Sequence, residues 1–192
     1  MTLVIAFIGR SGAVMAGDMR EIAFQGDDSC IEALERELYG GSIASDAALA
    51  ERAAEIGVTI RVRDDKIKVS SQQDGVLVGE VTETEGASVR CRRLYATRGS
   101  YAIAEIVDSR LEVTQRGRAS NFVVLGNDTT KRIADQCIRE AWDGGTLQDA
   151  MRLIMLTMQI AASVTASVSR TFVLVHTDQA VDLTRATGQD FR

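Results

Sequence analysis

The first twenty residues, Met1-Thr-Leu-Val-Ile-Ala-Phe-Ile-Gly-Arg-Ser-Gly-Ala-Val-Met-Ala-Gly-Asp-Met-Arg20, contain the pattern that decides the fold. Thr2 to Ile8 is a dense apolar run, Gly9 to Gly12 has the composition of a turn, and Ala13 to Ala16 is a second apolar run that ends at Gly17-Asp18. Two short apolar runs on either side of a glycine-containing turn are typical of a β-hairpin. The sequence therefore predicts that the chain opens with a hairpin.

Thr2 directly follows the initiator methionine. Cellular aminopeptidases remove a methionine that precedes a residue as small as threonine, and the mature chain would then begin at Thr2. Its hydroxyl and a free α-amine would belong to one residue, and an amine with a pKa of about 8 can accept the hydroxyl proton at neutral pH. Thr2 is thus a candidate nucleophile that carries its own base. The alternative is an ordinary strand residue, as in many proteins that begin with Met-Thr.

The composition is that of a single globular domain. The chain has 192 residues, 45% hydrophobic and 26% charged, which is enough for one substantial core. A net charge of −5 without a basic run argues against nucleic acid as a partner. No apolar stretch reaches about 18 residues, which argues against a membrane span, and the apolar start lacks the basic leader of a secretory signal.

The cysteines and the histidine of the sequence argue against several kinds of catalytic and metal site. Three cysteines, Cys30, Cys91 and Cys137, have no C-x-x-C spacing, so we expect reduced thiols and a cytoplasmic protein. The one histidine, His176, lies in an apolar strand pattern, which argues against a histidine-based triad or metal site. We expect neither a metal nor a cofactor.

The rest of the chain alternates between strand and helix patterns. Strands are predicted at residues 21–24, 58–62, 66–69, 76–81, 89–97, 101–107, 111–113, 121–125 and 170–176, helices at 29–39, 47–56, 131–142 and 147–164, and a tail or last strand from Asp182. Antiparallel strands with two consecutive helices late in the chain favour a layered α+β domain.

The opening hairpin resembles that of proteasome β subunits, in which a nucleophilic threonine is followed by strand, turn, strand and an aspartate with basic neighbours. The segments Met-Thr-Leu-Val-Ile-Ala-Phe-Ile-Gly and Gly-Ala-Val-Met-Ala-Gly-Asp-Met-Arg-Glu-Ile are more similar still to Connectase, a family of proteasome-related protein ligases from methanogenic archaea. The resemblance is carried by residues 1–22 and extends by landmarks along the chain. It implies the four-layer αββα sandwich of N-terminal-nucleophile hydrolases, which periodicity alone does not select.

The same resemblance implies the domain organisation. Proteasome subunits have a shorter connection in place of residues 26–57, so we expect one proteasome-like domain over residues 1–192 with a helical insertion there. The insertion would either shape substrate access at the rim of the site or cover the edge of a sheet. Characterised Connectases carry a further small β-rich domain, which we expect to be absent from residues 1–192.

In proteasome β subunits an aspartate on the second strand and a lysine on a later strand lie beside the threonine. Asp18 matches the aspartate by its place in the hairpin. Residues 1–65 contain no lysine, and with an insertion at 26–57 the family's lysine falls at Lys66, with Lys68 as the alternative. Its ammonium would stabilise the alkoxide of Thr2. The other interpretation of Lys66 is a solvated residue beside a turn.

The resemblance also implies supporting residues. Gly79, with a possible contribution from the amide of Glu80, corresponds to the glycine whose N–H stabilises the oxyanion, an interaction worth about 3 kcal/mol. Arg20 is a basic neighbour of the aspartate. Ser167 and Ser169 lie where a serine supports the nucleophile's amine, although the aspartate that accompanies such serines is not evident in this sequence.

The function implied is transpeptidation, in which Thr2 forms an ester with one peptide and the amine of a second peptide resolves it. The family's substrate is a Lys-Asp-Pro-Gly-Ala segment in the A subunit of the methanogen methyltransferase that transfers methyl groups to coenzyme M. Two alternatives remain: threonine-dependent proteolysis or amidohydrolysis, and a non-catalytic binding protein that keeps Met1. We expect a monomer or a small oligomer.

Overall fold

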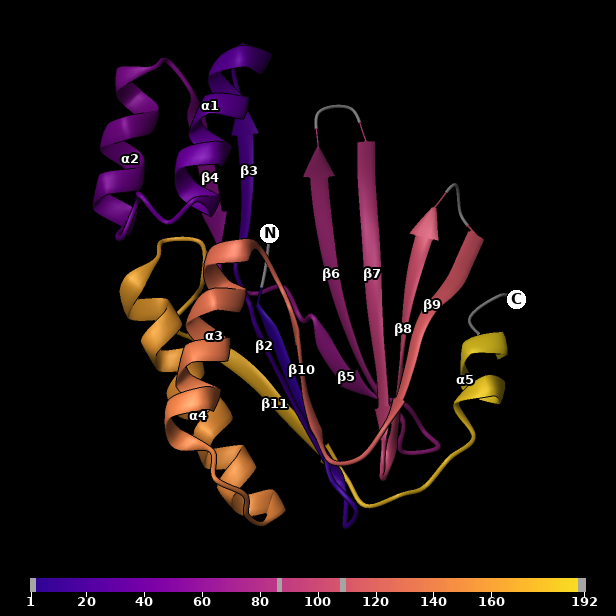
Figure 1. Ribbon diagram of the computed structural model, residues 1–192. Helices are drawn as coiled ribbons and strands as arrows, with labels where there is room; N and C mark the ends of the chain where they lie inside the picture. Colours follow the sequence, from indigo (N-terminus) through magenta and orange to yellow (C-terminus); the bar gives the residue numbers. More distant parts are fainter. Residues whose placement is uncertain (1–2, 86–87, 108–109, 190–192) are drawn as a thin grey trace.

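The computed structural model describes residues 3–85, 88–107 and 110–189 (Figure 1). Its elements, in chain order, are β1 (Val4–Ile8), β2 (Ala13–Asp18), β3 (Glu21–Gln25), α1 (Asp28–Tyr39), α2 (Asp46–Glu55), β4 (Thr59–Arg63), β5 (Val69–Ser71), β6 (Leu77–Glu85), β7 (Ser88–Thr97), β8 (Ser100–Val107), β9 (Arg110–Arg118), β10 (Asn121–Leu125), α3 (Asp128–Ala141), α4 (Leu147–Val164), β11 (Phe172–Thr177) and α5 (Leu183–Gln189).

The predicted opening hairpin is confirmed and forms the centre of a four-stranded antiparallel sheet. Its strands β1 and β2 pair in the register Val4 with Gly17, and the turn is closed by a 2.8 Å hydrogen bond from the N–H of Gly9 to the carbonyl of Gly12. The strand order is β10-β1-β2-β11, so the hairpin has a neighbour on each side. Every residue of β1 and β2 is buried, which explains why both strands are apolar up to Asp18 at the end of β2.

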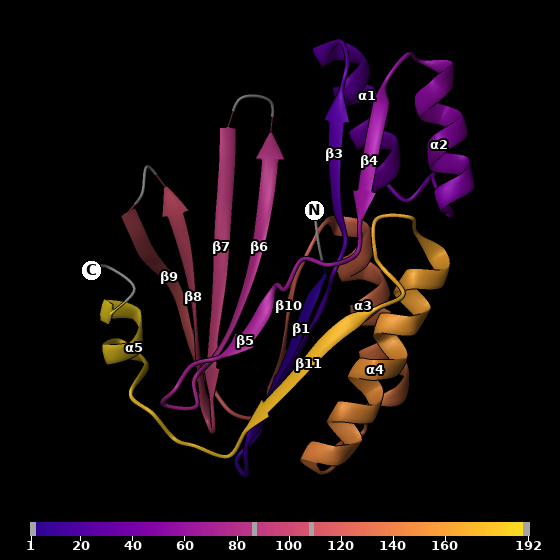
Figure 2. The ribbon, with the colours of Figure 1, turned by 180° about the vertical axis from the view of Figure 1, so that it is seen from behind.

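The arrangement of helices and sheets confirms a mixed α/β architecture (Figures 1 and 2). Helices α3 and α4 cover one face of the hairpin sheet, where side chains such as Ile5 and Val14 pack against Ile154 and Met158. The opposite face packs on a second antiparallel sheet of order β5-β6-β7-β8-β9. The short helix α5 lies on the outer face of this second sheet, against residues that include Tyr95.

Close approach of the two sheets requires glycine at position 79. A Cβ atom added to Gly79 of β6 would lie 2.6 Å from the sulfur of Met15 and 2.8 Å from a methyl group of Val4. Both neighbours are fully buried members of the core between the sheets. A larger residue at position 79 would therefore push the sheets apart.

The predicted inserted helices are present, but they belong to a larger unit that also includes the strands on either side of them. Strands β3 and β4 pair only with each other among the described residues, from Glu21 opposite Arg63 to Gln25 opposite Thr59. Helices α1 and α2 pack on this ribbon through a core of their own, which includes Leu34, Leu38 and Leu49. We call residues 21–63 the inserted unit, after the insertion that the family resemblance predicts at residues 26–57.

Three details differ from the sequence-based expectations. Helix α3 begins at Asp128 and not at residue 131, because the side-chain oxygen of its cap, Asn127, accepts from the N–H of Thr130 at 2.8 Å. Residues from Asp182 form a helix instead of a tail or strand, because Asp182 accepts from the N–H of Thr184 and the apolar residues of α5 then reach the second sheet. Residues 66–68 connect β4 to β5 and are not part of a strand.

No helix in the described part of the chain combines the length and the apolar character that crossing a bilayer requires.

We predict that Gly79→Ala lowers the free energy of unfolding by about 1–3 kcal/mol, because the added methyl group overpacks the contact with Met15 and Val4. Gly26→Ala is the matched control, since a Cβ there would meet its neighbours at 3.4 Å, an ordinary contact distance. Urea denaturation of both variants measures the difference. Equal stability of the two would show that the sheets have room at position 79.

Candidate active site

The carboxylate of Asp18, the last residue of β2, is the centre of a buried polar cluster. It is fully buried, and its Oδ1 accepts from the N–H of Leu3 at 2.9 Å while its Oδ2 accepts from the N–H of Arg20 at 2.8 Å. The N–H of Asp18 donates in turn to the carbonyl of Leu3 at 3.1 Å. Thr2 lies outside the described residues, but it is bonded to Leu3, so this cluster is built at the residue next to the candidate nucleophile.

Lys68, and not Lys66, is the lysine that the fold brings to Asp18. Its Nζ lies 3.1 Å from both carboxylate oxygens and also donates to the carbonyl of Arg20, and its side chain is only 4% exposed. The side chain of Lys66 is 46% exposed and pairs at 2.6 Å with Glu21 on the surface. The structure therefore places the alternative, Lys68, beside Asp18 and leaves Lys66 on the surface, and a catalytic role for Lys68 stays a prediction.

Main-chain hydrogen bonds explain this choice of lysine. The N–H of Lys66 donates to the carbonyl of Met19, and the carbonyl of Lys68 accepts from the N–H of Glu80. These two bonds fix the connecting segment beside the end of β2, with Lys68 turned inward. Burial is the main influence on the ammonium of Lys68 and lowers its pKa, whereas the charge of Asp18 opposes this shift.

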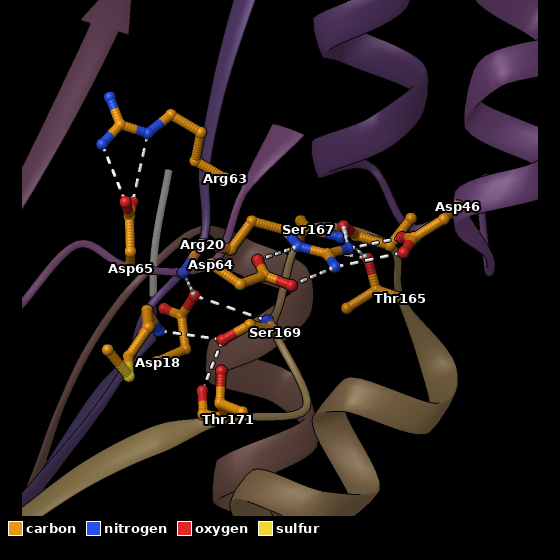
Figure 3. A network of polar contacts seen from close by, with 12 residues as sticks. Asp18, Arg20, Asp46, Arg63, Asp64, Asp65, Thr165, Ser167, Ser169 and Thr171 are labelled. Carbon is orange, nitrogen blue, oxygen red and sulfur yellow. Dashed lines mark hydrogen bonds and ion pairs between the residues drawn. The ribbon is translucent and has the colours of Figure 1, made fainter. Parts of the chain in front are cut away.

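The two predicted serines differ in their relation to Asp18 (Figure 3). The hydroxyl of Ser169 accepts from the N–H of Met19 at 2.8 Å and donates to the carbonyl of Thr171, and the N–H of Ser169 lies 3.5 Å from Asp18. The hydroxyl of Ser167 instead lies 3.0 Å from that of Thr165. Both serines are buried, but only Ser169 contacts the cluster directly.

The side chain of Arg20 points away from Asp18 and toward two carboxylates that the sequence analysis did not single out (Figure 3). Its guanidinium makes two 2.9 Å hydrogen bonds to Asp64, contacts Asp46 at 2.5 and 3.2 Å, and donates to the carbonyl of Ala166 at 2.7 Å. The hydrogen bond with Asp64 is the largest influence on Arg20 and raises its pKa, so the guanidinium is charged. Arg20 supports the cluster through its main chain and anchors other segments through its side chain.

Asp46 lies in the first turn of α2 and Asp64 directly follows β4, places where aspartate is common for local reasons. No local signal shows that both bind Arg20, because Asp46 is 26 and Asp64 is 44 residues from it along the chain.

Gly79 and Glu80 are engaged in the sheet. Gly79 pairs with Val69 on one side and Leu94 on the other, and the N–H of Glu80 donates to the carbonyl of Lys68 at 2.8 Å. The Glu80 amide is therefore not free to bind an oxyanion in this arrangement. Gly79 has a packing role in the structure, and an oxyanion role remains a prediction.

A surface groove of about 290 Å³ lies beside Lys68. Glu80 and Arg93 form a 2.6 Å ion pair along it, and Ile67 exposes most of its side chain there. Its lining comprises Ile67, Lys68, Val69, Ser70, Gln72, Val78, Glu80 and Arg93. The groove thus offers an apolar side chain and both signs of charge next to the buried cluster.

Among the residues whose side chains the structure describes, Asp18, Arg20 and Lys68 are the buried charged ones, and all three belong to the cluster. Buried charges cost folding free energy unless they are paired, and they concentrate where chemistry requires them. We therefore take this cluster as the candidate active site.

Comparison with known proteins gives one family match. The family model described as "Connectase MJ0548-like, N-terminal domain" matches residues 1–192. No curated protein matches the sequence closely enough to count as a relative.

Several solved structures are similar to this chain. A mutant of Anbu from Hyphomicrobium sp. strain MC1 has 13% identity and a TM-score of 0.48, with 91% of this chain and 80% of that chain covered. The eukaryotic HslV from Trypanosoma brucei has 13% identity and a TM-score of 0.40, covering 93% of this chain and 100% of that one. The Anbu complex from Pseudomonas aeruginosa, described as a helical assembly, has 16% identity and a TM-score of 0.41 over 91% and 80%.

We predict that the ammonium of Lys68 titrates below 10.5, the ordinary lysine pKa, because burial disfavours its charged form. Between its lowered pKa and 10.5 the unfolded chain binds more protons at this residue than the folded chain, so its contribution to the free energy of unfolding rises with pH over that interval. NMR of ¹³C-labelled lysine measures the titration, and Lys66 and Lys131 are the only other lysines to resolve.

The same titration in Asp18→Asn should give a still lower pKa for Lys68, because the carboxylate that favours the ammonium is then lost. A Lys68 midpoint at or above 10.5 in the unmodified protein would contradict the buried environment described here.

Proposed function

Because the chain belongs to the family of Connectase N-terminal domains, we propose that it is an N-terminal threonine transpeptidase, a protein ligase whose nucleophile is Thr2 after removal of Met1. The observation that carries this proposal is the buried pair of Asp18 and Lys68 at Leu3, the residue to which Thr2 is bonded. A hydroxyl nucleophile at the start of the chain needs a charged group beside it for activation, and the carboxylate–ammonium pair of Asp18 and Lys68 would supply that group.

Acylation is the first proposed step. The hydroxyl oxygen of Thr2 attacks the carbonyl carbon of a peptide bond while its proton passes to the α-amine of the same residue. The ammonium of Lys68, kept in place by Asp18, stabilises the negative charge on the oxygen. The C–N bond then breaks, the leaving amine takes the proton, and the acyl group remains on Thr2 as an ester.

Ligation is the second proposed step. The N-terminal amine of another peptide attacks the ester carbonyl, a new amide bond forms, and the threonine oxygen recovers a proton from the attacking amine. No net oxidation or cofactor is involved. Water in place of the amine would turn the same acyl-enzyme into a hydrolysis product, which is the alternative function of a threonine peptidase or amidohydrolase.

We propose that the substrate is a protein or peptide with a segment like Lys-Asp-Pro-Gly-Ala, bound next to Lys68. The groove lined by Ile67 and by the Glu80–Arg93 pair supports this, because it offers a carboxylate and a guanidinium to a segment that carries both a lysine and an aspartate. The order of helices, sheet, sheet and helix supports assignment to the αββα sandwich of N-terminal-nucleophile hydrolases. The enzyme would act in the cytoplasm as a monomer or small oligomer.

We predict that Thr2→Ala abolishes both ligation and hydrolysis, because no hydroxyl remains to form the ester. The assay incubates the protein with a peptide that contains the proposed segment and a second peptide with a free N-terminus, and mass spectrometry detects joined and hydrolysed products. Thr2→Ser, which keeps a hydroxyl, is the matched control and should retain activity. Unchanged turnover in Thr2→Ala, or full activity in protein that retains Met1, would favour a non-catalytic role for Thr2.

The two neighbouring lysines provide a second test. Lys68→Met should slow acyl-enzyme formation by about 10²- to 10³-fold, because the charge that stabilises the alkoxide is lost. Lys66→Met should change the rate by no more than about twofold, because an exposed ion pair contributes little. Rapid-quench measurement of the ester, with circular dichroism to verify folding, compares the variants. Equal rates in both would remove Lys68 from the mechanism.

A further inference from the structure

Arg20 is the point at which four separate segments meet (Figure 3). The residue itself follows β2, and its guanidinium binds Asp46 at the start of α2, Asp64 just after β4, and the carbonyl of Ala166 in the loop after α4. The side chain of Arg20 is 5% exposed, whereas those of Asp46 and Asp64 are 64% and 38% exposed. A buried cation is thus balanced by two carboxylates that lie near the surface.

The main chain of the same residue is part of the candidate active site. The N–H of Arg20 donates to Asp18, and the carbonyl of Arg20 accepts from the Nζ of Lys68. A displacement of residue 20 would therefore weaken one contact of the carboxylate and one contact of the ammonium together.

The carboxylates belong to segments whose position matters for the site. Asp46 lies within the inserted unit, so its bond to Arg20 fixes α2 against the body of the protein. Asp64 is the first residue after β4, at the start of the short segment that leads to Lys68. Lys66 belongs to the same segment, and its N–H donates to the carbonyl of Met19. The contacts of Asp64 and Lys66 therefore align this segment with residues 19 and 20.

We propose that Asp46 and Asp64 are positioning residues of the active site, which act through Arg20 to dock the inserted unit and to keep Asp18 and Lys68 paired beside the start of the chain. The inference rests on the proposed function for its effect on rate. Its structural part, the coupling of the inserted unit to the Asp18 contacts, stands on the geometry alone.

Asp64 is the more important of the two. It is less exposed than Asp46, and both of its oxygens receive 2.9 Å hydrogen bonds from the guanidinium. The bond to Arg20 is also the largest influence that lowers the pKa of Asp64. Asp46 contacts the same guanidinium from a more solvated position, where an ion pair contributes less. Loss of the Asp46 charge would leave Arg20 paired with the less exposed carboxylate of Asp64.

The chain offers a matched control for each variant. Asp65→Asn removes the same charge as Asp64→Asn one residue further along, but Asp65 pairs with Arg63 at the surface, away from Arg20 (Figure 3). Asp28→Asn removes a carboxylate from the first turn of α1, as Asp46→Asn does from that of α2, without a contact to Arg20. Each pair therefore differs chiefly in the link to Arg20.

The first measurement is the rate of acyl-enzyme formation with the peptide substrate. Asp64→Asn should lower kcat by about ten- to a hundredfold, and Asp46→Asn by about threefold to tenfold, with little change in KM, because misplaced reacting groups slow the chemical step. Both controls should stay within about twofold of the unmodified protein. Asp64→Glu, which keeps the charge, should recover part of the lost rate.

The second measurement does not depend on activity. Amide hydrogen exchange, followed by NMR, should become faster at Leu3 and Arg20, whose N–H groups both donate to Asp18, and across the inserted unit in Asp64→Asn and Asp46→Asn but not in the controls. If Asp64→Asn does not fold, Asp46→Asn decides the outcome by both measurements.

Unchanged exchange at Leu3 and Arg20 in a folded variant would overturn the coupling. Faster exchange with rates equal to those of the controls would show that the two carboxylates are structural and not positioning residues. If the unmodified protein formed no acyl-enzyme at all, the proposed function would fail, and the exchange data would still decide whether Asp46 and Asp64 hold the Asp18 contacts.

Discussion

The hydrogen bonds and the ion pair of the buried Asp18 carboxylate connect the opening hairpin to the segments around it. A charge removed from water is tolerated only when donors surround it, and here the donors are the N–H of Leu3, the N–H of Arg20 and the ammonium of Lys68. The register of the hairpin places the N–H of Leu3, and the turn after β2 places the N–H of Arg20. The segment that leads into β5 places the ammonium of Lys68. The hairpin and the second sheet must therefore both be in place before the site exists.

The local parts of this arrangement could be predicted from the sequence, because short-range patterns determine them. The buried hairpin follows from two apolar runs around a glycine turn, and α4 spans residues 147–164 as its helical periodicity predicts, with Thr146 as its cap. Asp18 could be placed because it lies in that hairpin. The family resemblance, which the match over residues 1–192 confirms, is the source of the role proposed for Thr2.

The remaining parts depend on contacts between distant segments. The choice between Lys66 and Lys68 is made by hydrogen bonds to Met19 and Glu80, which fix how the connecting segment turns. The two carboxylates that bind Arg20 come from different segments: Asp46 lies in the inserted unit, and Asp64 lies directly after it. In the sequence, each resembles an ordinary aspartate at a helix start or a turn. Helix α5 forms because the second sheet offers an apolar surface, which the seven residues of α5, with their mixed polarity, do not reveal by themselves. Periodicity carries no information about these pairings.

A nucleophile at the start of a chain poses a particular physical problem, since no preceding residue holds it in place. Its position must be fixed by the residue that follows it, and Leu3 is fixed by both a donated and an accepted hydrogen bond to Asp18. Any looseness in Asp18 would pass directly to Thr2 through one peptide bond. The role proposed for Thr2 would account for the convergence of Asp18, Arg20 and Lys68 at this place. Arg20 is held by Asp46 of the inserted unit and by Asp64 beside it, and its main chain contacts both Asp18 and Lys68. Under the proposed function, the inserted unit would thus support the site without supplying a reacting group.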